Sequence, residues 1–235
     1  MKELTVDKKD AGQRLDKYLK KYFKNASAGF LYKMLRKKNI TFNGKKAEGK
    51  ELLQSTDKIQ VFFSDETFEK MAGISTAMSE QDDFRKKFLK AYDVIKNIRV
   101  LYENEDLLFL YKPAGVLSQM ADAHFLSANE WICGYLEKEG KQPDYQTFRP
   151  GICNRLDRNT SGILMAAKTY AGSRALSAVI KYHQVRKYYL AIAEGRVEQD
   201  CDLEGYLYKN EAQNKVIVYA TKEDVPTHCQ EQASY

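Results

Sequence analysis

The sequence predicts an α+β protein in which a small helix–helix–hairpin module precedes a larger domain with a mixed, largely antiparallel sheet flanked by helices. Two helical patterns and an Asn-Gly turn follow one another within the first 63 residues. Strand-like runs and helical patterns are interspersed after residue 96. We therefore expect a first domain at 1–63, a linker and connecting helix at 64–96, and a second domain at 97–235.

The first domain is expected to contain two helices and a hairpin. Apolar residues recur three or four positions apart over residues 13–23 and 28–37, which predicts two amphipathic helices. Ile40–Phe42 and Ile59–Phe63 have the composition of strands. Asn43-Gly44 is a signal for a type I′ hairpin turn. Together these elements can bury a modest core.

The segment between the domains is predicted as a linker. Residues 64–82 are rich in Ser, Glu and Asp, and their hydrophobic residues are poorly periodic. Residues 83–96 have the pattern of a charged helix that leads into the second domain.

The second domain opens with a predicted hairpin, in which Val100–Tyr102 and Leu107–Tyr111 flank a polar turn. Ser127, with Glu130 three residues later, predicts a capped helix start. An apolar strand is expected after a polar turn that ends at Gly162, followed by a helix containing residues 176–183. The remaining expected strands are Arg186–Ala193, Leu203–Tyr208 and Lys215–Ala220.

The composition is that of a globular protein, with 43% hydrophobic and 30% charged residues. No apolar run is long enough for a membrane span, and the N-terminus lacks the apolar core of a signal peptide. We therefore expect a cytoplasmic protein with no membrane partner. The four cysteines form no Cys-x-x-Cys pair and the three histidines are scattered, so we expect reduced thiols and no metal site.

Positive charge is concentrated at the N-terminal end. Residues 1–64 hold 16 Lys and Arg against 7 Asp and Glu, a net of +9, whereas residues 65–235 hold 22 against 25, a net of −3. This asymmetry is typical of a nucleic-acid-binding module, although a lysine-rich solvated face has the same composition. The candidate contact residues are Arg14, Lys17, Lys33, Arg36, Lys37, Lys38, Lys45 and Lys46.

The most informative segment is the string from Asn154 to Lys168, in which one carboxylate, Asp157, stands between Arg155 and Arg158 in a polar turn before an apolar strand. A loop carboxylate at a strand edge is well placed for chemistry, and two guanidinium groups favour its ionised form and an anionic partner. A surface ion-pair cluster is the plain alternative. The tripeptide Arg155-Leu156-Asp157 alone is weak evidence for a catalytic site, because Arg14-Leu15-Asp16 repeats it near the N-terminus.

The longer string resembles the signature of the RluA family of RNA pseudouridine synthases, His-Arg-Leu-Asp-x-x-Thr-Ser-Gly followed by an apolar strand ending in Ala-Lys. Asn154 stands in place of the histidine, and we expect the turn to survive because asparagine also donates and accepts hydrogen bonds. The resemblance implies that Asp157 is the catalytic carboxylate. It also places Asn154, Arg155 and Thr160 beside the substrate, with Arg155 ordering the loop or holding a phosphate and Thr160 shaping the turn.

Two further segments carry the same resemblance. Lys112-Pro113-Ala114-Gly115 is an ordinary strand exit by itself, and the family's Lys-Pro-x-Gly motif implies that it frames the active-site cleft. Lys187, Tyr189 and Ala191 match a Lys-x-Tyr-x-Ala motif. A strand tyrosine is usually part of a core, but the family's tyrosine contacts the target base, which is the role implied for Tyr189.

The first 60 residues or so resemble the S-four RNA-binding domain. The resemblance rests on Arg14–Leu19, the basic second helix, Thr41–Gly44 and Asp57–Ile59. It implies docking onto structured RNA through phosphate contacts, mostly by shape.

The implied activity is isomerisation of specific uridines to pseudouridine in structured RNA, with large-subunit ribosomal RNA as the expected partner. Asp157 would act as a nucleophile at the sugar or assist abstraction of a ribose proton, and the sequence leaves both routes open. The target uridine would be flipped out of its stack. No cofactor or metal is needed for an isomerisation, and a monomer is expected.

The family's last motif, Arg-Thr-His-Gln-Ile-Arg, does not occur after Lys215. We therefore expect the second domain to be C-terminally incomplete, as a fragment, an early-terminated form or a degenerate member. The rival hypothesis is a catalytically impaired or truncated RNA-binding protein of the same ancestry. An unrelated hydrolase built on Asp157 is disfavoured because no histidine accompanies the signature.

Overall fold

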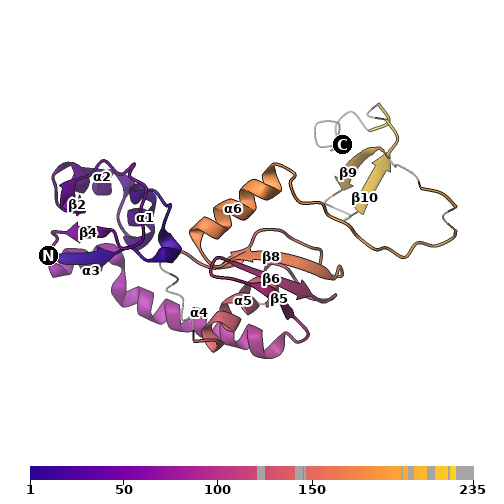
Figure 1. Cartoon of the computed structure of the whole chain (residues 1–235), viewed down its shortest axis with the longest axis horizontal. Coiled ribbons are helices and arrows are strands. Elements are labelled where there is room, and N and C mark those ends of the chain that lie inside the picture. Colours follow the sequence, from indigo (N-terminus) through magenta and orange to yellow (C-terminus); the bar gives the residue numbers. More distant parts are fainter. Residues whose placement is uncertain are drawn as a thin grey trace. The chain divides into compact units, whose positions relative to one another are not determined.

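The computed structural model shows two compact units, Met1–Arg186 and Lys187–Tyr235, which we treat separately (Figure 1). The structure describes residues 1–120, 125–140, 145, 147–196, 198–200, 204–210, 215–221 and 223–225. No helix in these ranges is both long enough and apolar enough to cross a membrane.

The N-terminal part of the first unit packs two helices against a four-stranded antiparallel sheet with strand order β1-β4-β2-β3. Leu15, Leu19, Leu31 and Leu35 project from the helices into a core that also holds Ile59 of β4. The elements are β1 (Lys2–Thr5), α1 (Leu15–Tyr22), α2 (Ala28–Arg36), β2 (Ile40–Phe42), β3 (Lys45–Lys46) and β4 (Lys58–Val61).

The turn between β2 and β3 has the backbone that its sequence predicts. Asn43 and Gly44 have φ angles of 49° and 73°, and both positive values belong to a type I′ turn. Phe42 pairs with Lys45 across this turn, so the lysines of β3 are carried on an antiparallel ribbon. The first strand, β1, has no counterpart in the sequence-based prediction.

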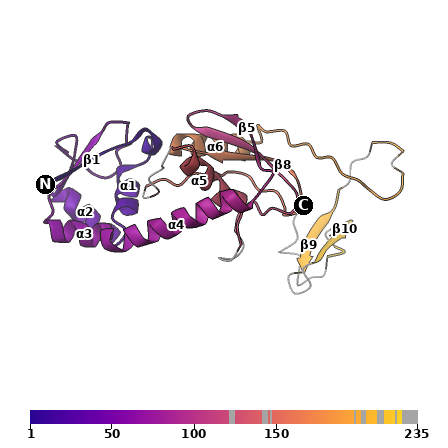
Figure 2. The same ribbon diagram turned by 90° about the horizontal axis from the view of Figure 1, so that it is seen from below.

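The segment predicted as a linker is helical, which corrects the assignment of residues 64–82. Helix α3 (Asp65–Ala72) begins where the Ser64 hydroxyl accepts a hydrogen bond from the Thr67 amide at 3.3 Å. It ends at Gly73, whose φ of 68° is left-handed, and α4 (Ile74–Val94) follows at once. Figure 2 shows the length of α4. Phe68 and Ala72 are buried in the first core, so α3 is part of that core.

The second sheet has strand order β5-β6-β8-β7, and all three strand pairings are antiparallel. An isolated parallel bridge joins Leu117 and Ser127 beside it. Leu108, Leu110 and Leu164 of the sheet pack against Ile132 and Leu136 of α5. The elements are β5 (Arg99–Glu103), β6 (Leu107–Lys112), α5 (Ala128–Lys138), β7 (Gly151–Ile152), β8 (Gly162–Ala167) and α6 (Tyr170–Lys181).

The second unit contains one antiparallel hairpin, β9 (Tyr206–Asn210) and β10 (Lys215–Tyr219), in the part that the structure describes. The strand predicted over Arg186–Ala193 is wrong, because these residues have no ladder partner and Leu190 and Ile192 are fully exposed. The start of the strand predicted from Leu203, and the tail from Thr227 to Tyr235, lie outside the described residues.

Candidate active site

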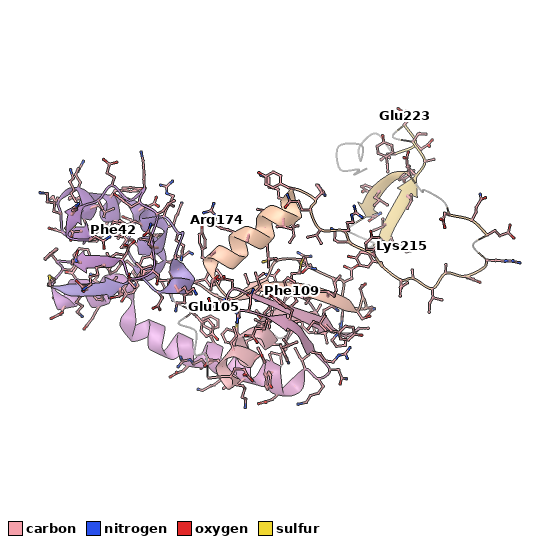
Figure 3. The ribbon with its side chains drawn as sticks, viewed as in Figure 1. Phe42, Glu105, Phe109, Arg174, Lys215 and Glu223 are labelled. Atoms are coloured by element: carbon pink, nitrogen blue, oxygen red, sulfur yellow. The ribbon has the colours of Figure 1, made fainter. Side chains whose placement is uncertain are left out.

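The loop that carries Asp157 is fixed at its start by Asn154. The Asn154 side-chain amide donates to the Ile163 carbonyl at 3.1 Å and accepts from the Met165 amide at 2.7 Å. Met165 pairs with Phe109 of β6, whose side chain is labelled in Figure 3, so this anchor reaches the middle of the sheet. Asparagine therefore keeps the turn intact, as its donor and acceptor groups predict.

The residue before Asp157 is held by Ser118. The Ser118 hydroxyl, which is buried, donates to the Leu156 carbonyl at 2.6 Å and accepts from the Leu156 amide at 3.0 Å. One hydroxyl thus satisfies both backbone groups of Leu156. Ser118 carries no motif that would have revealed this role in the sequence.

The residue after Asp157 is held by the Lys112–Gly115 turn. The Arg158 carbonyl accepts from the Gly115 amide at 2.8 Å and from Lys112 Nζ at 3.1 Å. The Arg158 guanidinium donates back to the Gly115 carbonyl through Nε at 3.2 Å. The Lys-Pro-x-Gly segment therefore holds the backbone of the loop, and its role in framing an active-site cleft stays a prediction.

Lys112 is a buried cation that ties these pieces together. Its ammonium also donates to the carbonyls of Pro113 at 3.1 Å and Val116 at 2.8 Å. Burial lowers the pKa of Lys112, and the nearby Asp157 carboxylate opposes this effect by raising it. Asp157 is therefore close enough to act on the ammonium electrostatically, and the hydrogen bond from Lys112 to the Arg158 carbonyl links the β6 exit to the loop.

Asp157 itself is aimed outward from a fixed backbone. Its carbonyl accepts from the Thr160 amide at 3.1 Å, which closes the turn, and its side chain is exposed. Among the described residues the carboxylate has no hydrogen-bond or ion-pair partner. Neither Arg155 nor Arg158 forms an ion pair with Asp157, and the Arg158 guanidinium contacts the Gly115 carbonyl instead.

The space around Asp157 is open within the unit Met1–Arg186. The three pockets that we describe there have volumes of about 680, 330 and 130 Å³, and Asp157 lines none of them. The largest is lined by the turn at Asp7–Lys9 and the β5–β6 turn at Glu103–Asp106. An exposed carboxylate on a pinned loop suits a substrate that is itself large enough to cover it.

The remaining predicted residues fall into two groups. Arg155 is exposed, and Tyr189 is 63% exposed in the unit Lys187–Tyr235, so its contact with a base stays a prediction. The basic residues predicted to contact RNA are all exposed: Arg14, Lys17, Lys33, Arg36, Lys37, Lys38, Lys45 and Lys46. Of these, Arg14 is engaged in an ion pair with Asp16. No three His, Cys, Asp or Glu side chains converge as metal ligands in the described ranges.

Comparison with known proteins identifies the family. Residues 106–234, which include the pinned loop and both of its anchoring segments from Lys112 onward, match the family described as RNA pseudouridylate synthase. The chain belongs to the RNA pseudouridylate synthase family. The exposed carboxylate and the turn that holds it thus lie inside the family's defining region.

Relatives of this synthase-family chain are ribosomal enzymes by name. Ribosomal large subunit pseudouridine synthase C of Pasteurella multocida is 28% identical over 97% of this chain and 64% of its own length. The protein of the same name from Rickettsia felis is 32% identical over 78% of this chain and 55% of its own length. The chain therefore spans less than two thirds of these relatives. A structure of human RNA Pseudouridylate Synthase Domain Containing 4 matches 42% of this chain and 34% of its own at 17% identity, with a TM-score of 0.30.

Proposed function

We propose that this protein isomerises uridine to pseudouridine in structured RNA, with large-subunit ribosomal RNA as the substrate and Asp157 as the catalytic carboxylate. The observation that carries the proposal is the placement of Asp157: the backbone on both sides of it is bound by a separate segment, while its carboxylate is exposed. A group held in this way needs little reorganisation when the substrate arrives.

The reaction conserves atoms. The bond between the sugar C1′ and N1 of uracil breaks, the base turns, and C1′ bonds to C5, which loses its proton while N1 gains one. Asp157 assists either by attacking C1′ or by taking up a ribose proton, and both routes need an ionised carboxylate within reach of the sugar. The uridine has to leave its stack first, and an exposed carboxylate is open to such an extruded nucleotide.

The supporting roles follow from the contacts. Lys112, Gly115 and Ser118 are positioning residues, because they bind the loop backbone and not the substrate. Arg155, exposed and next to Asp157, is assigned to an RNA phosphate. Tyr189 is assigned to stacking on the flipped base, where a contact of this kind is worth about 1–3 kcal/mol.

The basic N-terminal module is assigned to RNA docking as an S-four-like domain. Its support is the exposure of the lysines on β3 and at the end of α2, which leaves their charges available to phosphates. Docking of this kind positions the RNA without reading its sequence.

One observation favours a second candidate, an RNA-binding protein of the same ancestry without turnover. Asp157 lines none of the three described pockets, so none of these pockets could hold a base beside the carboxylate. The two candidates share the docking step and differ only in catalysis.

The test measures pseudouridine directly. Ribosomal RNA transcripts are incubated with the protein, treated with a pseudouridine-selective carbodiimide and read by primer extension; release of tritium from uracil C5 gives the rate. Wild type should produce new stops, and Asp157→Asn should lower the rate by about 10²-fold or more. Asp83→Asn, which changes an exposed carboxylate on α4, is the matched control and should leave the rate unchanged. Equal rates for wild type and Asp157→Asn would rule out catalysis by Asp157.

A further inference from the structure

We propose that the N-terminal module holds an unpaired nucleotide of the RNA, with Tyr32 as the stacking surface for the base and Lys33, Arg36 and Lys46 as contacts for the phosphates. The inference rests on the proposed docking of RNA by this module and adds a site and a ligand class to it. It makes the module a reader of unpaired positions as well as a charged surface.

The site is a pocket of about 330 Å³ on the outer side of α2. Its lining combines three cations with one carboxylate, and an exposed aromatic ring stands beside them. The lining residues are Gly29, Tyr32, Lys33, Leu35, Arg36, Lys46, Ala47 and Glu48. A volume of this size lies at the lower end of ligand pockets, which suits a single nucleotide better than a larger ligand.

Tyr32 is exposed and yet fixed in position. Tyr32 is 45% exposed, although the helix that carries it packs Leu31 and Leu35 into the core. The Tyr32 hydroxyl donates to the Asp16 carboxylate at 2.7 Å. Asp16 is held in turn by Arg14, whose Nε and Nη2 lie 3.1 and 2.8 Å from its two oxygens. The orientation of the ring is therefore set before any ligand arrives.

Gly49 fixes the other side of the ring. Its φ of 91° is left-handed, and a Cβ at this position would lie 3.2 Å from Tyr32 Cε1 and 3.2 Å from Asp16 Cβ. The absence of a side chain at Gly49 lets the ring rest against the backbone. A ring that is ordered in advance loses little conformational entropy on binding.

A second hollow of about 130 Å³ is also lined by Tyr32, together with Lys17 and Lys20. The ring thus stands between two hollows, and lysines line both. A phosphodiester chain that passes one base over the ring can reach cations before and after it. Electrostatic attraction to phosphate and stacking on an aromatic ring are the two components of single-strand recognition.

The ligand has to be an unpaired nucleotide and not a paired one. Bases within an A-form duplex are stacked on each other and offer no free face, whereas bases in loops and bulges do. A protein surface is a poorer match, because three cations around one ring would need a cluster of carboxylates opposite them.

The test compares two RNA probes with the full chain: a blunt-ended duplex of about 20 base pairs formed from two strands, and the same duplex with a two-nucleotide bulge. Tyr32→Ala should weaken binding to the bulged RNA by about 5- to 150-fold, which is the expected loss of one stacked base. Binding to the fully paired duplex should change little, and the salt dependence should not change. Tyr32→Phe keeps the ring but loses the hydrogen bond to Asp16, so its affinity for the bulged RNA should lie between those of wild type and Tyr32→Ala.

Two matched variants separate stacking from charge. Lys33→Ala should weaken binding to both probes and reduce the slope of log affinity against log salt by up to about 0.9. Tyr182→Ala removes another exposed tyrosine, 67% exposed just after α6, and should leave both affinities unchanged. Thermal unfolding of each variant checks that the module stays folded.

A second readout does not depend on a variant. With 2-aminopurine placed in the bulge, wild-type protein should quench its fluorescence on binding, because stacking on an aromatic ring quenches this base. Binding without quenching, or an equal effect of Tyr32→Ala on both probes, would overturn the inference. Either result leaves the carbodiimide assay of Asp157 unaffected, so the failure of this site and the failure of the proposed catalysis are distinguishable.

Discussion

Replacement of Ser118 by alanine tests whether the loop around Asp157 is positioned by the segment after β6. The substitution removes one buried hydroxyl and with it the hydrogen bonds to the carbonyl and amide of Leu156, at 2.6 and 3.0 Å. Each such bond contributes about 0.5–1.5 kcal/mol net, so the free energy of unfolding should fall by about 1–3 kcal/mol.

The effect on catalysis should be larger than the effect on substrate binding. Without Ser118, Leu156 is free to shift and carries Asp157 with it, while the contacts of Arg158 to Gly115 persist. A displacement of about 1 Å of a catalytic group can cost about 10²-fold in rate. We therefore expect the single-turnover rate to fall by about 10- to 100-fold and the affinity for RNA to change by less than about threefold.

Thr169→Val is the matched control because it also removes one buried hydroxyl that makes two hydrogen bonds. Thr169 Oγ1 donates to Asp106 at 2.5 Å and caps α6 by accepting from the Gly172 amide at 3.1 Å. Thr169 follows the C-terminal end of β8, whereas the Asp157 loop precedes the N-terminal end of that strand. Its loss should cost similar stability and leave the rate unchanged.

Urea unfolding gives the stability of both variants, and tritium release under single-turnover conditions gives their rates. If Ser118→Ala lost stability but retained the wild-type rate, the hydroxyl would be a structural hydrogen bond only. If Thr169→Val lowered the rate as much as Ser118→Ala, any destabilisation of this domain would suffice, and the positioning argument would fail.

Two further predictions concern the helices. Gly134→Ala should lower the free energy of unfolding by about 1–3 kcal/mol, because the new Cβ would lie 2.2 Å from the Phe88 carbonyl oxygen. Gly29→Ala should raise it by about 0.5–1 kcal/mol, because a Cβ there has no atom within 4 Å and alanine favours the helix. Thermal unfolding measures both changes. Burial raises the pKa of Cys133 from 9.0 to about 11. The stability that the neutral Cys133 thiol contributes is therefore present below pH 9 and lost between about pH 9 and 11, because the unfolded chain loses this proton first. The midpoint of urea unfolding should fall less over that range in Cys133→Ala than in wild type.

The elements that the sequence predicted correctly are those with strong local signals. The helix from Ala28 has Ser27 as its N-cap, and the Asn43-Gly44 turn has the residues that a type I′ geometry needs. The β5–β6 hairpin and the strand after Gly162 show runs of apolar residues next to polar turns. In each case the local preference and the tertiary fold agree, so a single sequence suffices.

Two of the errors in secondary structure have opposite causes. Residues 64–82 were assigned to a linker on composition, although Ser64 and Gly73 are standard start and stop residues for a short helix. Here the capping signals outweigh the polar composition, and Phe68 anchors the helix in the core. Residues 186–193 have the alternation of a strand, but a strand also needs a partner that local sequence does not reveal.

The site shows the same division between local and non-local information. The sequence predicts the turn around Asp157 and the pairing capacity of Asn154, because both lie in one contiguous string, and the structure shows both. It did not identify Ser118, which is 38 positions before Leu156 and carries no motif. Nor did it show that the flanking arginines leave Asp157 unpaired, because the direction of a side chain depends on what else it can contact.

Asp157 has no salt-bridge partner among the residues that the structure describes, and this strengthens the case for catalysis. A carboxylate that is already paired with two guanidinium groups would have to give up those contacts before it could act on a sugar. Here the buried Lys112 ammonium, which Asp157 influences electrostatically, donates to three backbone carbonyls and cannot move with the substrate. The loop therefore presents the Asp157 carboxylate against a fixed electrostatic background. When no RNA is bound, an open, unpaired carboxylate adds nothing to the stability of the fold. Asp157→Asn should therefore leave the free energy of unfolding within about 0.5 kcal/mol of wild type, while it removes turnover.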